Sequence, residues 1–160
     1  MSQHSGLPQP PAHVHFVGVG GIGMSGLARI LVAWGYRVTG SDAFPSNLLD
    51  QLRAEGVDVQ IGHDETTNAS NADLIVATAA VRSTNPEIHA AKERGTPVIK
   101  RAELLGMLAN ARTCVAVAGS HGKSTTSGML VTALQAVGQD PSYAVGAVVG
   151  STGTNAAPTA

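Results

Sequence analysis

Two glycine-rich stretches of the chain carry the residue types that bind phosphate. The first reads GVGGIGMSG over residues 18–26, and the second reads GSHGKSTT over residues 119–126. Glycines at a strand-to-helix turn let the backbone approach an anion, and free N–H groups at the helix start bind it. Each stretch is therefore a candidate phosphate loop.

The first stretch matches G-x-G-x-x-G through Gly18, Gly20 and Gly23, directly after an apolar run at 14–19. Asp42 ends the next expected strand, where a dinucleotide-binding fold keeps its ribose-binding acid. By pattern alone three interpretations stay open: NAD binding, binding of another diphosphate nucleotide, or a purely structural glycine turn. The motif predicts a diphosphate without identifying the molecule that carries it.

The second stretch places Lys-Ser at an expected helix N-terminus, which makes a nest of N–H donors. Lys123 would contact the β and γ phosphates, and the Ser124 hydroxyl would bind Mg²⁺. The spacing departs from the usual G-x-x-x-x-G-K-[ST], because Val117 occupies the place of the first glycine. A helix start without a ligand is the alternative. A triphosphate loop weighs against an NAD(P)-binding oxidoreductase domain, which has no need of one.

Short apolar runs alternate with helical patterns from residue 13 onward, and this order predicts an α/β fold. We expect a Rossmann-like doubly wound parallel sheet, followed by the start of a P-loop α/β domain with too few elements to close a second sheet. The expected domains are a flexible tail over 1–12, a nucleotide-binding domain over 13–107 and the incomplete second domain over 108–160. The expected strands are 14–19, 36–41, 57–62, 73–79, 96–100, 113–118 and 142–150, and the expected helices are 23–35, 47–56, 85–95, 101–111 and 123–137.

The composition excludes several classes of protein. The net charge is −1 and no long Lys/Arg run exists, so a nucleic-acid or membrane-surface binder is not expected. No apolar run approaches the roughly 18 residues of a membrane span. A single cysteine cannot form an internal disulfide and suits a reducing compartment, so we expect a cytoplasmic protein.

Other side chains are expected to be structural. His13 and His15 lie on one face of a strand without a third metal ligand nearby, so we expect exposed histidines on an edge strand. Cys114 is expected to be a small buried hydrophobe. The helical spacing predicts that Met24, Met107 and Met129 pack in the core, and that the last helix buries a stripe of Thr126, Met129, Leu130, Ala133, Leu134 and Val137.

Five segments in this order resemble the Mur ligases. They are HFVGVGGIGMSGLA (15–28), YRVTGSD (36–42), ATAAVRSTNPEI (77–88), RAELLGML (101–108) and GSHGKSTT (119–126), and GTNA (153–156) is similar to the family's segment after the phosphate loop. Ser120 and Ser124 replace threonines of the family's loop and keep both hydroxyls. The shortened loop spacing is the family's own.

The resemblance implies that the first domain binds a UDP-sugar and not NAD, with the diphosphate on the first loop. Ser41 and Asp42 would recognise the uridine, and the segment from Thr78 to Val81 would lie against the diphosphate and the amino sugar. Asn85 would join that segment, although an N-cap before Pro86 explains it equally well. The residues implied for this site are Gly18, Gly20, Gly21, Ile22, Gly23, Met24, Ser25, Ser41, Asp42, Thr78, Ala79, Ala80 and Asn85.

The resemblance also implies a ligase that uses ATP and Mg²⁺ to join L-alanine to UDP-N-acetylmuramate through an acyl phosphate, in peptidoglycan precursor synthesis. Lys123 would hold the migrating phosphoryl group, Ser124 the Mg²⁺ and Thr125 a phosphate oxygen. His121 would reach toward the phosphates or the substrate, so Lys123 and His121 are the expected catalytic residues. The implied ATP site comprises Gly119, Ser120, His121, Gly122, Lys123, Ser124 and Thr125.

The family places further magnesium-binding acids and an amino-acid-binding domain beyond the part of the chain that ends at residue 160. We therefore expect that residues 1–160 alone cannot form the amide bond. A nucleotide-binding module without catalysis is the remaining alternative, and the sequence does not address the oligomeric state.

Overall fold

The structure is a computed structural model that describes residues 6–64 and 68–159. A parallel sheet forms its first unit, with the strands in the order β3-β2-β1-β4-β5. The expected doubly wound parallel sheet is confirmed, and β1 is its central strand. The strands are β1 (His13–Val17), β2 (Arg37–Asp42), β3 (Asp58–Ile61), β4 (Leu74–Ala77) and β5 (Val98–Lys100).

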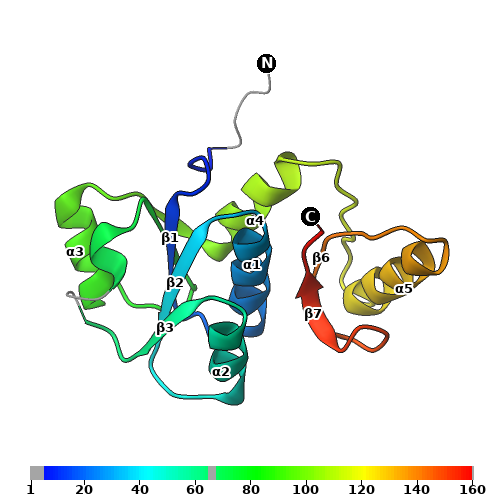
Figure 1. The fold of residues 1–160 in the computed structure, drawn as a ribbon, viewed down its shortest axis with the longest axis horizontal. Coiled ribbons are helices and arrows are strands. Elements are labelled where there is room, and N and C mark those ends of the chain that lie inside the picture. Colours follow the sequence, from blue (N-terminus) through cyan, green and yellow to red (C-terminus); the bar gives the residue numbers. More distant parts are fainter. Residues whose placement is uncertain (1–5, 65–67, 160) are drawn as a thin grey trace.

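Helices cover both faces of the sheet (Figure 1). One face carries α1 (Ile22–Ala33), α2 (Asn47–Ala54) and α4 (Arg101–Asn110), and the other carries α3 (Pro86–Arg94) and the short 3-10 helix η1 (Asn68–Asn71). In this part of the chain no helix is long and apolar enough to cross a membrane.

Each face has its own core, because successive side chains of a strand point to opposite sides. Phe16 packs with Met24 and Leu31 of α1 on the first face, where Met107 lies at the margin. Val17 faces the other way and packs with Ile88 of α3. Burying a side chain of this size contributes roughly 1.5–3 kcal/mol. The predicted core position of Met24 is confirmed, and Met107 packs against the core while only partly buried.

The chain before β1 also packs against this unit. Residues 1–5 of the expected tail lie outside the described residues, but Leu7 is buried. The Tyr36 hydroxyl donates to the Pro8 carbonyl at 2.8 Å. Residues 6–12 are therefore held by specific contacts.

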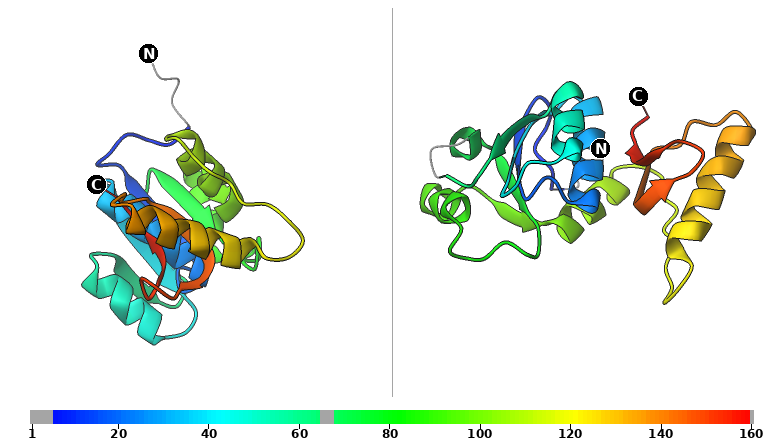
Figure 2. Two further views of the ribbon diagram at one scale, coloured as in Figure 1. Left: turned by 90° about the vertical axis from the view of Figure 1, so that its right-hand side faces the viewer. Right: turned by 90° about the horizontal axis from the view of Figure 1, so that it is seen from below.

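A smaller second unit consists of α5 (Lys123–Ala136) and the antiparallel strands β6 (Tyr143–Val149) and β7 (Thr154–Ala157). Its two strands lie between α1 and α5 (Figures 1 and 2). Its core is small: Val131, Tyr143, Val145 and Val149. The expected strand at 142–150 is confirmed, whereas β7 was not predicted.

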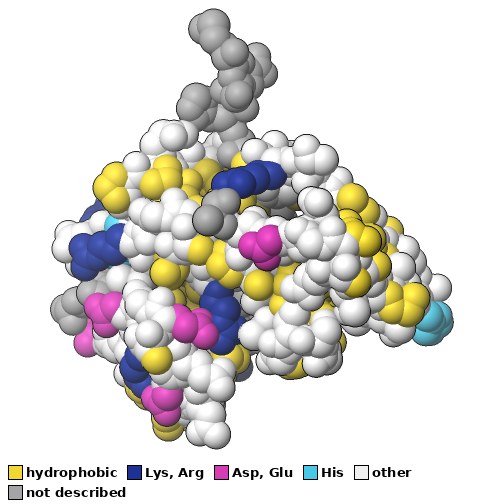
Figure 3. Space-filling view, turned by 45° about the vertical axis from the view of Figure 1, so that its right-hand side comes forward, with side chains coloured by type: hydrophobic (Ala, Val, Ile, Leu, Met, Phe, Trp, Pro, Cys, Tyr) yellow, Lys and Arg dark blue, Asp and Glu magenta, His cyan; other side chains and the backbone are white. Residues whose placement is uncertain are grey.

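Three expectations for this second part are wrong. Residues 113–118 form no strand, because an apolar run becomes a strand only beside a partner and no described strand runs alongside it. Cys114 lies in that segment and is exposed. The predicted stripe of α5 is not the buried one: Val131 is buried, while Met129 is 65% and Val137 is 72% exposed, since β6 is the element that the helix mainly contacts among the described residues. Hydrophobic side chains are accordingly visible on this part of the surface (Figure 3).

Candidate functional site

The first glycine loop connects β1 to α1 at the carboxyl edge of the sheet. Gly18 has a φ of 84°, which favours glycine, and a Cβ atom there would lie 2.6 Å from Thr78 Cγ2 at the end of β4. The amides of Gly18 and Val19 donate to the Ser41 carbonyl at 2.8 and 3.0 Å. The loop is thus fastened to the ends of β2 and β4. It lies where the strand order reverses between β1 and β4, which is the usual ligand position of an open α/β sheet.

The start of α1 offers unused backbone donors. Gly21 is the N-cap and supplies no side chain to bond the first helical amides. No described residue accepts a hydrogen bond from the amides of Gly21, Ile22 and Gly23. The Arg101 side chain lies over Gly23, where a Cβ atom would be 3.2 Å from its Nη1. Three amides, the positive end of a helix and a guanidinium group together suit a diphosphate.

Arg101 is a residue of this site that was not among those predicted from the sequence. Its position over Gly23 depends on the packing of α4 against α1. No local pattern predicts that contact. The motif RAELLGML, already noted for its resemblance to the family, was the only available signal.

Other predicted residues of this site contribute in different ways. Met24 lies in the core and the amides of Met24 and Ser25 both donate to the Gly21 carbonyl. The buried Ser25 hydroxyl donates to the Ile22 carbonyl at 3.0 Å. Ala79 and Ala80 are exposed in the turn after β4. Direct contacts from these residues to a ligand stay predictions.

Asp42 and Ser41 hold the loop from the end of β2. The Asp42 Oδ2 atom accepts from the Gly20 amide at 2.8 Å, and a Cβ atom on Gly20 would lie 2.7 Å from that oxygen. Ser41 is fully buried and its hydroxyl donates to Glu87 at 2.7 Å. Both residues therefore have a structural role that the pattern did not reveal, and their role in uridine recognition stays a prediction.

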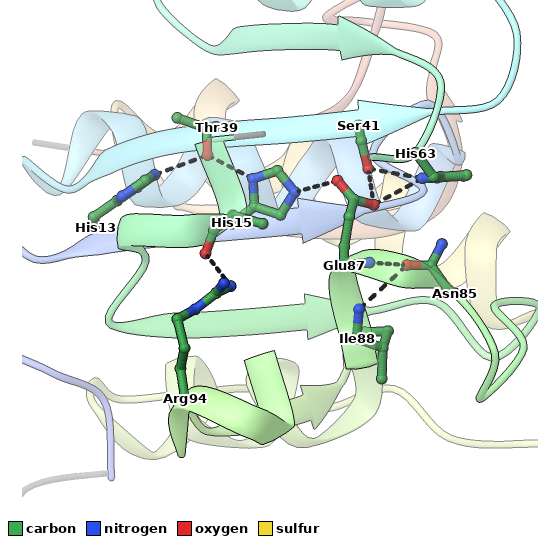
Figure 4. Close-up of polar contacts among 10 residues, drawn as sticks. His13, His15, Thr39, Ser41, His63, Asn85, Glu87, Ile88 and Arg94 are labelled. Carbon is green, nitrogen blue, oxygen red and sulfur yellow. Dashed lines mark hydrogen bonds and ion pairs between the residues drawn. The ribbon is translucent and has the colours of Figure 1, made fainter. Parts of the chain in front are cut away.

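Asn85 caps α3, as one of the two interpretations of its sequence predicted. Its Oδ1 atom accepts from the amides of Glu87 and Ile88 at 2.9 and 3.3 Å, and Pro86 occupies the first helical position. The cap places Glu87 in the first turn of α3, directed at the sheet (Figure 4).

Glu87 joins a buried polar network between α3 and the sheet (Figure 4). Its Oε1 atom lies 3.2 Å from His15 Nε2, and its Oε2 atom lies 2.8 Å from His63 Nδ1. His15 Nδ1 lies 2.7 Å from Thr39 Oγ1, which lies 2.8 Å from His13 Nε2. The expectation that His13 and His15 are exposed on an edge strand is wrong, since β1 is central and both are buried.

The network fixes where its protons lie. His13 Nδ1 contacts the Asn71 carbonyl at 3.0 Å and must donate to it, so in neutral His13 the other nitrogen accepts from Thr39. Thr39 has one proton, and it must therefore accept from His15 Nδ1. When Glu87 is ionised, all contacts are satisfied together if both nitrogens of His15 donate, and the contact with Glu87 is then an ion pair.

Burial and hydrogen bonding act on Glu87 in opposite directions. Burial raises its pKa, but the hydrogen bonds from His15, Ser41 and His63, with the charge of His15, outweigh that effect and the pKa is lowered from its ordinary value of 4.5. For His13, burial is the main cause of a lowered pKa. Both directions agree with an ionised Glu87 and a neutral His13.

The second loop is exposed throughout. Gly122 is the N-cap of α5 and adopts the left-handed conformation with a φ of 76°. The Lys123 ammonium group folds back over the loop, where it donates to the Gly119 carbonyl and, at 3.1 Å, to the Ser120 carbonyl. The side chains of His121, Ser124 and Thr125 are exposed. The predicted helix start is confirmed, and its ligand stays a prediction.

A hollow of about 570 Å³ between the two units is lined by neither loop, whereas a second hollow of about 750 Å³ is lined in part by Ser124 and Thr125 of the second loop. Trp34 forms part of the wall of the first hollow, and the Arg112 guanidinium lies 4.8 Å from the centre of that ring. The described residues also hold no group of three metal-binding side chains.

A comparison with known proteins identifies the class. The profile of the Mur ligase family, catalytic domain, matches residues 13–113. The chain belongs to the Mur ligase family.

Two curated relatives show which ligases of the family this chain is similar to. The chain is 47% identical over 95% of its length to UDP-N-acetylmuramate–L-alanine ligase of Clavibacter michiganensis subsp. michiganensis, and 50% identical over 98% to that of Acidothermus cellulolyticus. It covers 32% and 33% of these relatives, about a third of their length.

Solved structures agree with this similarity. UDP-N-acetylmuramate-alanine ligase MurC of Thermotoga maritima matches with a TM-score of 0.82 and 31% identity, over 90% of this chain and 34% of that one. The UDP-N-acetylmuramate:L-alanyl-gamma-D-glutamyl-meso-diaminopimelate ligase of Neisseria meningitides has a TM-score of 0.82 and 32% identity, over 91% and 46%. The names of both ligases contain UDP-N-acetylmuramate, and they differ in the second substrate.

Proposed function

We propose that this chain supplies the UDP-sugar site and the ATP loop of a ligase that joins L-alanine to UDP-N-acetylmuramate. Membership in the Mur ligase family and the names of the curated relatives support the reaction. The unused amides at the start of α1 beside Arg101 are the observation that carries the first site. The proposed units are residues 13–107 for the UDP-sugar and 108–160 for the beginning of the ATP-binding domain.

In the first site, the amides of Gly21, Ile22 and Gly23 would bind the diphosphate, with Arg101 neutralising its charge. The uridine would lie toward the end of β2, at Ser41 and Asp42.

In the second site, Lys123 would leave the carbonyls of its own loop and contact the β and γ phosphates of ATP. The exposed Ser124 hydroxyl beside it would supply one oxygen ligand to Mg²⁺. The ion would supply charge neutralisation on the phosphates. Thr125 and His121 would contact phosphate oxygens or the substrate.

The reaction proceeds in two steps. The substrate carboxylate attacks the γ phosphorus of ATP, which breaks the bond to the ADP oxygen and forms an acyl phosphate. The amine of L-alanine then attacks the acyl carbon, phosphate leaves and the amine loses a proton, which gives the amide. A carboxylate alone offers a poor leaving group, so the protein's part is to position the reactants and to neutralise charge.

Calorimetric titration of the chain with UDP-N-acetylmuramate, NADH and Mg-ATP tests the proposal. We expect binding of the UDP-sugar and of Mg-ATP and none of NADH. In Gly20→Ala the added methyl group displaces the Asp42 carboxylate, so UDP-sugar binding should be lost. Gly106→Ala is the matched control, because its methyl group would meet nothing within 4 Å.

Binding of NADH in place of the UDP-sugar would overturn the proposal. Equal loss of binding in both alanine variants would show that the first loop is not the site.

A further inference from the structure

One side chain of the second unit contacts the phosphate-binding turn of the first. Asn155 of β7 is 6% exposed, and its Nδ2 atom donates to the Ile22 carbonyl at 2.6 Å. Its Oδ1 atom accepts from Arg29 Nη1 at 3.1 Å. Arg29 in turn donates to the Glu55 carboxylate at 2.6 Å, at the end of α2. Both ends of the Asn155 amide group are therefore engaged.

The backbone is shaped to allow this contact. A Cβ atom on Gly26 of α1 would lie 2.9 Å from Ala156 Cβ and 3.0 Å from Asn155 Nδ2. Such distances leave no room for a side chain, so β7 reaches α1 only because residue 26 is glycine. The Asn155 amide is thus placed against the first turn of α1 by close packing and not by a mobile side chain.

The Ile22 carbonyl is one end of a peptide unit whose other end, the N–H group, faces the proposed anion site. This N–H group belongs to Gly23. No described residue accepts a hydrogen bond from it, and it lies beside Arg101. Hydrogen bonds to a carbonyl polarise the peptide and strengthen its N–H as a donor. The Ser25 hydroxyl adds a second side-chain donor at 3.0 Å to the same oxygen.

We propose that Asn155 is a positioning residue for the diphosphate: its hydrogen bond to the Ile22 carbonyl orients and polarises the peptide whose N–H binds the anion. This inference rests on the proposed function of the first loop. Because β7 belongs to the unit that carries Lys123, the same contact fixes the diphosphate site relative to the ATP loop.

Asn155→Asp tests the inference, since it keeps the size of the side chain and an acceptor for Arg29 but removes the donor to Ile22. Tyr143→Phe is the matched control: the lost hydroxyl contacts Thr152 and Thr154 at 2.6 and 2.7 Å, so the change removes side-chain hydrogen bonds of the second unit that involve neither Asn155 nor α1. Amide spectra of the chain would be recorded during titration with UDP and, separately, with uridine.

For Asn155→Asp we expect UDP to bind more weakly by at most about fivefold, because one whole hydrogen bond is worth about that much and here the bond to the diphosphate is weakened and not removed. Uridine, which lacks the diphosphate, should bind as it does to the wild type. The Gly23 amide proton of the free protein should move upfield, because the N–H is less polarised. Tyr143→Phe should leave all three quantities unchanged.

The outcomes separate this inference from the proposed function. A wild-type chain that does not bind UDP would overturn both. If the wild type binds UDP and Asn155→Asp binds it equally well, or if Tyr143→Phe weakens UDP binding as much, only the role of Asn155 is wrong. A loss of affinity shared equally by uridine would likewise show general loosening in place of diphosphate positioning.

Discussion

Glu87 is the residue on which the first unit should depend most strongly. It is fully buried, and its carboxylate is contacted by His15, Ser41 and His63. Glu87→Ala would leave those three groups without this acceptor. Removing one partner of a buried ion pair costs about 3–5 kcal/mol. With a urea dependence of about 2 kcal/mol per molar, a loss of about 4 kcal/mol lowers the unfolding midpoint by about 2 M.

Urea unfolding followed by the fluorescence of Trp34 measures this effect, since the single tryptophan lies at the end of α1 in the same unit. Glu93→Ala is the control on the same helix: Glu93 pairs with His89 at 3.5 Å and both side chains are 68% exposed. An exposed pair is worth about 0–1 kcal/mol, so its midpoint should fall by less than about 0.5 M.

Glu87→Gln should fall between these two variants, because an amide keeps the shape and one acceptor but loses the charge. Equal midpoints for Glu87→Ala and Glu93→Ala would refute the reasoning. They would mean that water or a rearranged side chain replaces the carboxylate at no cost.

Three further predictions concern residues of the same region. Asn85→Ala removes the acceptor for two amides of α3 and should cost about 1 kcal/mol, seen by circular dichroism as a melting point about 2–4 °C lower, while Asn85→Asp should melt like the wild type. The pKa of His13 is lowered from 6.5, so the unfolded state takes up the proton first and stability falls as the pH drops below 6.5. The pKa of Glu87 is lowered from 4.5, so its contribution is complete above 4.5 and is lost as the pH falls through its folded value. The contribution of His13 is measured by comparing the free energy of unfolding across pH for the wild type and for His13→Gln. If the two profiles stay parallel below pH 6.5, His13 does not cause the predicted loss of stability.

The sheet and its helices were predictable because their signals are local. Alternating apolar strands and helical patterns predicted each of the five parallel strands to within a few residues. The sequence Asn85-Pro86-Glu87 predicted a helix start, and the structure has one there. Lys123 was expected at the first turn of a helix and begins α5.

The wrong predictions concern residues whose contacts are with residues distant in the sequence. His15 and Glu87 are 72 positions apart, so nothing near the histidine indicated that it is buried. The sequence did contain one signal of this network. His13 and His15 on one strand and Thr39 and Ser41 on the next lie on the same side of the sheet. Four polar side chains on one side of a buried sheet indicate a polar partner from another element. Residues 113–118 failed for a related reason, since an apolar run cannot specify which strand it will pair with.

The position of Lys123 has a consequence for how the second loop discriminates among anions. Its ammonium group rests on two carbonyl oxygens of its own loop, which act as an internal substitute for a ligand. An incoming phosphate must exchange with these oxygens, and the side chain loses little further freedom when it does. A weakly charged anion gains nothing from that exchange. A chain of phosphates, which presents several charged oxygens at once, can displace the carbonyls and still gain free energy.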